Sequence, residues 1–180
     1  MIQQRELLNS DEVKITIQRL CQQLVENHYD FSNTVIIGIQ PRGSLLNQRI
    51  VTELNLLLPT TIVQHGNIDI SFHRDDIMRR DEPILPKSME IDFDIEGKNV
   101  ILIDDVLFTG RSIRSAMEAL MLFGRANRIE LLVLISRRFS RHLPIEPNYV
   151  GKTIDSIDSE KVIVEWKEIT GQDRILIVKS

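Results

Sequence analysis

The feature that most limits the folds open to this chain is an order of elements that occurs twice: a short apolar run, a tight polar loop and an amphipathic segment. Residues 35–39 (VIIGI) lead into the loop 40–43 (QPRG), and apolar residues then recur at helical spacing from Ser44. Residues 100–103 (VILI) lead into a turn over 104–112 and a second helical pattern. Unbroken apolar strands that alternate with helices predict a mainly parallel sheet.

Further elements complete this α/β pattern. Residues 129–135 form a third apolar run, and apolar residues from Val13 to Val25 predict an amphipathic helix capped by Asn9 or Ser10. Two runs, 162–166 and 174–178, predict a terminal hairpin added to the edge of the sheet. We therefore expect one doubly wound sheet flanked by helices, with ligands beyond the carboxyl ends of its strands.

Composition limits the class of protein. The 180 residues, 42% of them apolar, suit a single domain over 1–180, and a net charge of −4 does not suit a globally basic nucleic-acid binder. The single cysteine, Cys21, excludes an internal disulfide and favours a reducing, cytoplasmic compartment. The N-terminus lacks the apolar centre of an export signal, and no stretch approaches the roughly 18 apolar residues that span a bilayer, so no membrane association is expected.

The segment 100–112 (VILIDDVLFTGRS) carries the clearest chemical signal. The Thr-Gly-Arg-Ser turn over 109–112 opens a helix, whose free N–H groups can wrap a phosphate, and Gly110 leaves room for close approach. Asp104 and Asp105 accept hydrogen bonds only, which suits a vicinal diol or Mg²⁺. One loop can therefore hold a sugar phosphate from both ends.

Other interpretations of these residues are simpler or point elsewhere. Two acids can merely end a strand, a Thr-Gly turn can merely cap a helix, and a phospho-acceptor pocket leaves 109–112 unexplained. The run Gly151-Lys152-Thr153 has the tail of a P-loop, but Glu146 stands where its leading glycine belongs. The four histidines lack metal-site spacing and are expected to be surface or hydrogen-bonded residues.

The complete string over 100–112 resembles the 5-phosphoribosyl-1-pyrophosphate (PRPP) motif of type I phosphoribosyltransferases. The likeness extends along nearly the whole chain to the PyrR family, the pyrimidine-operon attenuation regulators that are also uracil phosphoribosyltransferases. It rests on four segments in the family's order: 38–43 (GIQPRG), 69–76 (DISFHRDD), the PRPP motif continued by Arg111, and 143–145 (LPI) with 149–152 (YVGK).

The resemblance implies transfer of the ribosyl phosphate of PRPP to uracil, which gives UMP and pyrophosphate, with Mg²⁺ on the pyrophosphate. An oxocarbenium-like transition state would make positioning and neutralisation of the leaving group the main sources of catalysis. The implied roles are ribose hydroxyls or Mg²⁺ for Asp104 and Asp105, pyrophosphate for Arg42, the Gly43 backbone and Arg74, and the 5-phosphate loop for Val106, Leu107, Thr109, Gly110, Arg111 and Ser112.

The stretch 73–98, which includes Arg74, is rich in charges of both signs and carries Pro83 and Pro86. It is a candidate mobile lid, a loop or hairpin that would exclude water from PRPP. The alternative is an ordinary disordered insertion.

The base pocket departs from the family pattern. After the strand that ends near Ile135, the family commonly has an aspartate and an arginine, whereas this chain has Ser136 and Arg137 in a loop that is one residue longer. Base recognition around Arg137, Arg138 and Phe139 is a hypothesis, and the missing acid leaves the choice between uracil and a purine base open.

Binding of a pyrimidine-operon leader mRNA is the second implied activity. Affinity for RNA depends on lysines and arginines that neutralise phosphates. The candidates are Lys14 and Arg19 on the first helix and a cluster formed by Arg137, Arg138, Arg141, His142 and Lys152. The first helix has Gln18 and Gln22 where relatives tend to carry Thr and His. For the second cluster, the alternative is that its arginines belong to the predicted active site.

Three functions therefore follow from the sequence: a Mg²⁺-dependent uracil phosphoribosyltransferase that also regulates pyrimidine genes, an RNA-binding attenuator whose PRPP/UMP site is mainly a nucleotide sensor, and a purine-base phosphoribosyltransferase. Relatives form dimers or larger assemblies, so a homo-oligomer is expected.

Overall fold

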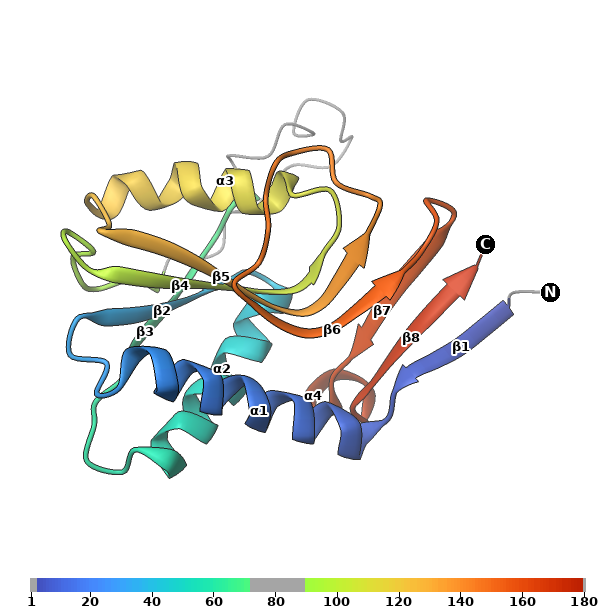
Figure 1. The fold of residues 1–180 in the computed structure, drawn as a ribbon, viewed down its shortest axis with the longest axis horizontal. Helices are drawn as coiled ribbons and strands as arrows, with labels where there is room; N and C mark the ends of the chain where they lie inside the picture. Colours follow the sequence, from blue (N-terminus) through green and yellow to red (C-terminus); the bar gives the residue numbers. More distant parts are fainter. Residues whose placement is uncertain (1–2, 72–89, 180) are drawn as a thin grey trace.

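A computed structural model describes residues 3–71 and 90–179 (Figure 1). Its elements in chain order are β1 (Gln3–Leu8), α1 (Ser10–His28), β2 (Thr34–Ile39), α2 (Arg42–Leu57), β3 (Gln64–Ile68), β4 (Asn99–Leu107), α3 (Arg111–Leu120), a 3₁₀ turn (Met121–Phe123), β5 (Arg128–Arg138), β6 (Tyr149–Asp155), β7 (Glu160–Glu165), α4 (Lys167–Thr170) and β8 (Arg174–Lys179).

The main sheet has five parallel strands in the order β3-β2-β4-β5-β6. Figure 1 shows α1 and α2 on one face of this sheet and α3 on the other. The predicted doubly wound α/β architecture is therefore confirmed. Because all five strands are parallel, their carboxyl ends meet at one edge, where the loops that lead into α2 and α3 also lie.

Side chains of β4 alternate between two apolar cores. Ile101 and Ile103 belong to the core under α1 and α2, whereas Val100 and Leu102 belong to the core under α3. Successive side chains of a strand point to opposite faces, which is why an unbroken apolar run is needed where both faces are covered.

The first helix forms as predicted, and its start is fixed locally. The Asn9 side chain accepts a hydrogen bond from the Glu12 N–H at 3.0 Å, and the Glu12 carboxylate accepts one from the Asn9 N–H at 2.8 Å. This capping box satisfies two N–H groups that a helix start leaves free. One face of α1 is buried against the sheet, including Leu20, Cys21 and Leu24.

The expected terminal hairpin forms, but its predicted place was wrong. Strands β7 and β8 pair with β1 in a separate antiparallel sheet, in the order β1-β8-β7. The edge of the main sheet next to β5 is occupied by β6. Strand β1, with which the hairpin pairs, has the sequence QQRELL, in which only the last two residues are apolar. The sequence of β1 therefore has no clear strand pattern.

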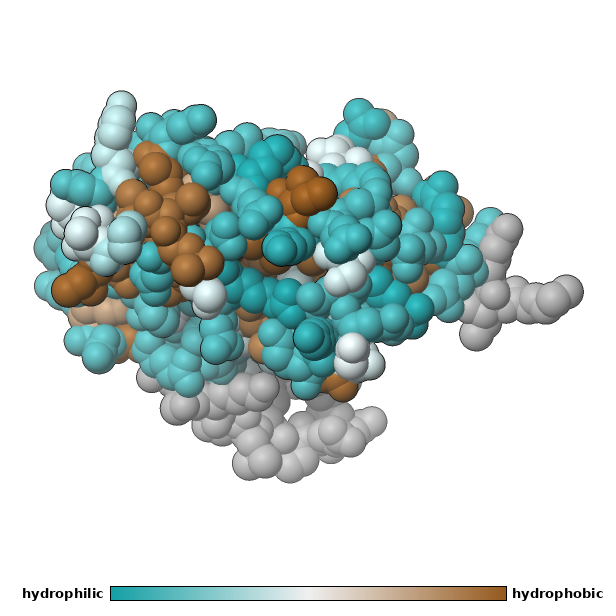
Figure 2. Space-filling view, turned by 90° about the horizontal axis from the view of Figure 1, so that it is seen from below, coloured by the Kyte–Doolittle hydropathy of each residue, from teal (hydrophilic) through white to brown (hydrophobic). Residues whose placement is uncertain are grey.

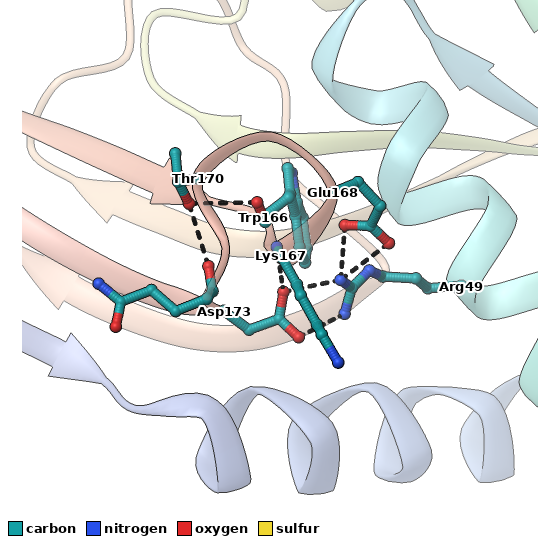
Figure 3. A network of polar contacts seen from close by, with 7 residues as sticks. Arg49, Trp166, Lys167, Glu168, Thr170 and Asp173 are labelled. Atoms are coloured by element: carbon teal, nitrogen blue, oxygen red, sulfur yellow. Dashed lines mark hydrogen bonds and ion pairs between the residues drawn. The ribbon is translucent and has the colours of Figure 1, made fainter.

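A cluster of side chains around Arg49 joins the second sheet to α2 (Figure 3). The Arg49 guanidinium donates to both carboxylate oxygens of Asp173 at 2.8 and 2.7 Å and to Glu168 at 2.8 Å, and it lies over the Trp166 ring, 4.7 Å from the centroid. The Asp173 carboxylate also accepts from the Lys167 N–H at 2.8 Å. We call Arg49, Trp166, Glu168 and Asp173 the Arg49 clamp.

The face that carries α1 and α2 is mostly hydrophilic, but apolar atoms gather toward one end of it (Figure 2). Leu56, in the last turn of α2, and Ile62, shortly after it, are both exposed. In the part of the chain that the structure describes, no helix combines the length and apolar character needed to cross a bilayer.

Candidate active site

Two loops that were singled out in the sequence lie side by side at the carboxyl edge of the main sheet. Strands β2 and β4 pair directly, with Gly38 opposite Ile103, so the loop after β2 adjoins the end of β4. Helix α2 begins at Arg42, after a cis peptide bond between Gln40 and Pro41. A Cβ at Gly43 would lie 2.4 Å from the Ile103 carbonyl oxygen, so only glycine allows α2 to begin this close to β4.

The paired acids lie within β4 rather than in the turn after it. The sequence placed the end of the strand at Ile103, but pairing with β5 continues to Leu107, which lies opposite Ser136. This correction has a physical consequence, because strand residues alternate in direction. Asp104 lines a pocket at the first turn of α3, and both acids line a second cavity together with Arg42.

Both carboxyl groups are buried, and their environment disfavours ionisation. Asp104 is 9% exposed and Asp105 is 5% exposed. Burial raises the pKa of both groups; for Asp104 the charge of Asp105 adds to the rise, while the Arg42 charge opposes it in both. Such raised pKa values at a cleft are typical of functional sites.

One oxygen of this pair has no partner. The Asp105 N–H donates to Asp104 Oδ1 at 3.0 Å, but Asp105 Oδ2 accepts no hydrogen bond from the residues the structure describes. A buried carboxylate oxygen without a donor costs about 1–3 kcal/mol, which a hydroxyl or a cation from a ligand would recover. In the described ranges, no group of three or more His, Cys, Asp or Glu side chains forms a metal site. The pair nevertheless fits Mg²⁺, because it offers hard oxygen donors and one of them is free.

The turn after β4 lines a small pocket, which we call the anion pocket because it is the candidate phosphate site. Gly110 has a φ of 89°, in the left-handed region that favours glycine, and α3 starts at the next residue. A pocket of about 240 Å³ is lined by Asp104, the segment 106–113 and Ser115. The segment 109–112, singled out in the sequence as a phosphate loop, thus lines this pocket, and its backbone N–H groups and the hydroxyls of Thr109 and Ser112 are potential donors.

A second, wider cavity of about 720 Å³ connects the two loops with the second sheet. Its lining includes Arg42, both acids, Phe108 and Arg137. It also includes residues 161–163 of β7, which the sequence analysis did not place at the site. The hairpin was expected, but nothing in its sequence shows that it belongs to a separate sheet or that β7 lines the same cavity as the acids.

The structure separates the three predicted base-binding residues. Arg137 lines the cavity, with its guanidinium carbon 3.9 Å from the centre of the Phe108 ring, and it donates to Ser156 Oγ at 2.7 Å. Arg138 instead pairs with Asp155 at the surface. Phe139 is 85% exposed and has a φ of 65°. Only Arg137 therefore lies at the cavity beside the acids.

The predicted RNA-binding residues fall into two groups. Lys14 and Arg19 are exposed on α1, and Arg19 donates to the Gly151 carbonyl at 2.5 Å, which places it beside the exposed Lys152 of β6. In the second group, the His142 side chain is exposed. Arg141, by contrast, points inward and donates to five oxygens of the protein.

Part of the predicted lid cannot be placed, because residues 73–89, including Arg74, lie outside the described residues. Its described end, 90–98, packs on the body of the protein. Glu90 forms an antiparallel bridge with Asn67, and Ile95 is buried in the core under α3.

Comparisons with known proteins agree with this geometry. A family model described as "Phosphoribosyl transferase domain" matches residues 3–169. A protein of Enterococcus faecalis named "Bifunctional protein pyrR" is 40% identical over 176 residues, which cover 98% of this chain and 97% of the relative. A "Bifunctional protein PyrR" of Actinobacillus pleuropneumoniae is 38% identical over 174 residues, 97% of this chain and 96% of the relative.

Solved structures of the same fold are more distant in sequence. A hypoxanthine phosphoribosyltransferase of Staphylococcus aureus has a TM-score of 0.71 and 22% identity, with 98% of this chain and 92% of that chain covered. A hypoxanthine phosphoribosyltransferase of Trypanosoma cruzi has a TM-score of 0.74 and 15% identity, with 97% and 94% covered. At these identities the likeness concerns the fold.

Proposed function

Because this chain belongs to the phosphoribosyl transferase family, and within it to the PyrR proteins, we propose that it transfers the 5-phosphoribosyl group of PRPP to uracil and regulates pyrimidine genes by binding mRNA. The observation that carries the catalytic part is the buried Asp105 oxygen that accepts no hydrogen bond from a described residue, in a residue that lines the same cavity as Arg42 and Asp104. A ribosyl group bound there would bring hydroxyl donors to the acids and its 5-phosphate to the turn over 109–112.

The reaction breaks the bond between C1 of the ribose and the pyrophosphate oxygen, which keeps the electron pair, and forms a bond from C1 to N1 of uracil. The N1 proton passes to water. Arg42, at the start of α2, would neutralise the departing pyrophosphate together with the backbone of Gly43. Asp104 and Asp105 would hold Mg²⁺ or the ribose hydroxyls, and a bound Mg²⁺ would supply positive charge to the leaving group. Thr109, Gly110, Arg111 and Ser112 would fix the 5-phosphate, with Val106 and Leu107 leading into the turn.

Arg137 and residues 161–163 line the same cavity as the two acids. In our proposal the base lies between them and the acids. Ser136 stands where the family commonly has an acid, and its hydroxyl oxygen accepts a hydrogen bond from Arg141 at 2.8 Å. A purine base is the alternative substrate, but the hypoxanthine phosphoribosyltransferases that share this fold are only 22% and 15% identical to this chain.

The substrate is tested by incubating the protein with PRPP, Mg²⁺ and single bases, and by following pyrophosphate release. We expect turnover with uracil. Turnover with hypoxanthine or guanine and none with uracil would replace this proposal with the purine alternative.

RNA binding is the second part of the proposal, and the exposed Lys14, Arg19 and Lys152 on the α1 and β6 surface support it. We expect a pyrimidine-operon leader RNA to bind with a steep salt dependence and to bind more tightly with UMP. An RNA-binding attenuator that only senses nucleotides would show this binding without turnover. No binding at low salt would remove the regulatory part.

We further propose that the protein is a homo-oligomer in a reducing, cytoplasmic environment. The exposed Leu56 and Ile62 provide apolar surface for a contact between copies. Cys21 is buried and unpaired, and burial raises the pKa of its thiol to about 12, which keeps it protonated. Sedimentation equilibrium would test the oligomer, and a monomer at micromolar concentration would contradict it.

A further inference from the structure

The side chain of Arg141 connects the loop between β5 and β6 to the turn that forms the anion pocket. Its Nη1 donates to the Leu107 carbonyl at 3.2 Å and to the Phe108 carbonyl at 2.5 Å. The next carbonyl, that of Thr109, accepts a hydrogen bond from the His142 N–H at 3.0 Å. Three consecutive carbonyl oxygens at the start of the turn are thus held from one neighbouring loop.

The same guanidinium also fixes the loop from which it comes. It donates to the Arg137 carbonyl at 3.0 Å, to Ser136 Oγ at 2.8 Å and to the Ile145 carbonyl at 3.2 Å. Ile145 in turn packs against Gly110, where a Cβ would lie 3.2 Å from its Cδ1. Arg141 therefore sets the spacing between the end of β5, the segment around Ile145 and the turn.

This arrangement has an electrostatic consequence for an anion. Carbonyl oxygens near a phosphate repel it, and hydrogen bonds from a guanidinium offset their partial negative charge. All five acceptors of Arg141 are neutral groups. The Glu146 carboxylate acts on the guanidinium through its charge. The hydrogen bonds of the guanidinium therefore go to the turn and to its own loop rather than to an acid.

We infer that Arg141 is a positioning residue for phosphoribosyl transfer, which holds the turn over 107–110 in the shape that accepts the 5-phosphate of PRPP, rather than a residue that contacts RNA. This inference rests on the proposed transfer reaction. It differs from the expectation drawn from the sequence, in which Arg141 belonged to an RNA-binding cluster.

The test compares Arg141→Gln and Arg141→Lys with Arg125→Gln, a control that removes the same charge from an exposed site before β5. In Arg141→Gln we expect the KM for PRPP to rise about tenfold or more, because several hydrogen bonds from a charged donor are lost. The KM for uracil should stay within about twofold, the Lys variant should lie between Gln and wild type, and Arg125→Gln should match wild type. PRPP affinity measured by calorimetry should follow the KM for PRPP.

A milder variant keeps the test valid if Arg141→Gln does not fold. Ser136→Ala removes one acceptor and leaves the guanidinium in place, and we expect a KM for PRPP raised about two- to fivefold. An unchanged KM for PRPP in the folded Arg141→Gln protein would overturn the inference, as would unchanged values in both Arg141→Lys and Ser136→Ala. Loss of leader RNA binding with normal PRPP affinity would also overturn it.

The wild-type protein in the same assay separates this inference from the proposed function. No turnover of wild type with any base means that the proposed function has failed. Normal turnover of wild type together with normal PRPP kinetics in Arg141→Gln means that only the role of Arg141 has failed.

Discussion

Helix α2 carries two arginines that each lie near two carboxylates, and the two groups differ in almost every physical respect. Arg49 donates hydrogen bonds to both Asp173 and Glu168 (Figure 3). Arg42 acts on Asp104 and Asp105 through its charge, without a hydrogen bond to either acid. The pKa of Asp173 is lowered: burial raises it, but hydrogen bonds from Arg49 and from the Lys167 N–H outweigh burial. Burial raises the pKa of Asp104 and Asp105.

The difference shows that similar residues can satisfy one another in one place and keep capacity for a ligand in another. Hydrogen bonds satisfy the acids of the Arg49 clamp, which therefore contribute to stability. The acids of β4 retain an oxygen without a donor, which lowers stability and leaves capacity for a ligand. Substitutions in the two groups should consequently have opposite effects on activity and stability.

The largest effect is expected for Asp105→Asn and Arg42→Ala. Each should lower the rate of transfer by about 100-fold or more, because each removes electrostatic stabilisation of the ribosyl group or of the leaving pyrophosphate. The free energy of unfolding should be unchanged or higher for Asp105→Asn, since a buried acid without a full set of partners is removed. Pyrophosphate release and urea unfolding measure the two quantities, and near-wild-type rates in both variants would refute the assigned roles.

The next largest effect is expected for Arg49→Met, on stability. It leaves two acids without their shared donor and removes the cation above Trp166, so we expect the free energy of unfolding to fall by about 2–3 kcal/mol. Transfer at a temperature where the variant is folded should stay near wild type. A variant that loses activity but not stability would show that the clamp belongs to the active site.

Within the clamp, the two acids should contribute unequally. Side-chain exposure is 14% for Asp173 and 50% for Glu168, so solvent screens the second pair more strongly. We expect Asp173→Asn to lower the free energy of unfolding by about 1–2 kcal/mol and Glu168→Gln by less than about 1 kcal/mol. Equal losses in the two variants would mean that burial does not determine their contributions.

The smallest effect concerns pH. Because the pKa of Asp173 is lower in the folded protein than its ordinary value of 3.8, the unfolded chain binds its proton first as the pH falls. The stabilisation by Asp173 is thus complete above that value and is lost as the pH falls through the folded pKa. The difference in unfolding free energy between wild type and Asp173→Asn should shrink below about pH 4. A constant difference down to strongly acid pH would contradict this.

Local patterns in the sequence were sufficient for much of the fold and part of the site. The apolar runs indicated β2, β4 and β5, and Asn9 or Ser10 marked the start of α1, of which Asn9 is the cap. The segment over 100–112 brings Asp104 and the turn over 109–112 to one pocket, because residues a few positions apart stay close on folding. Strands β1, β3 and β6 were not predicted, since sequences such as QHGNI have too few apolar residues to form a pattern.

Contacts between distant segments were beyond the reach of the sequence. Pairing with β5 extended β4 through the two acids, and pairing of β8 with β1 carried residues 161–163 to the cavity. The three residues proposed for the base share one stretch of sequence but not one location, because the chain turns at Phe139. Arg141, a surface candidate by its charge, proved to be an internal donor.

The sequence by itself determined the class of fold, the family and the residues most suited to a ribosyl phosphate, because these depend on periodicity and on groups only a few positions apart. Only the tertiary structure decided which arginines contact solvent, which contact carbonyls and which acid oxygen lacks a donor. Burial and hydrogen bonding depend on segments that are far apart in the chain, and they separate the acids of β4 from those of the Arg49 clamp.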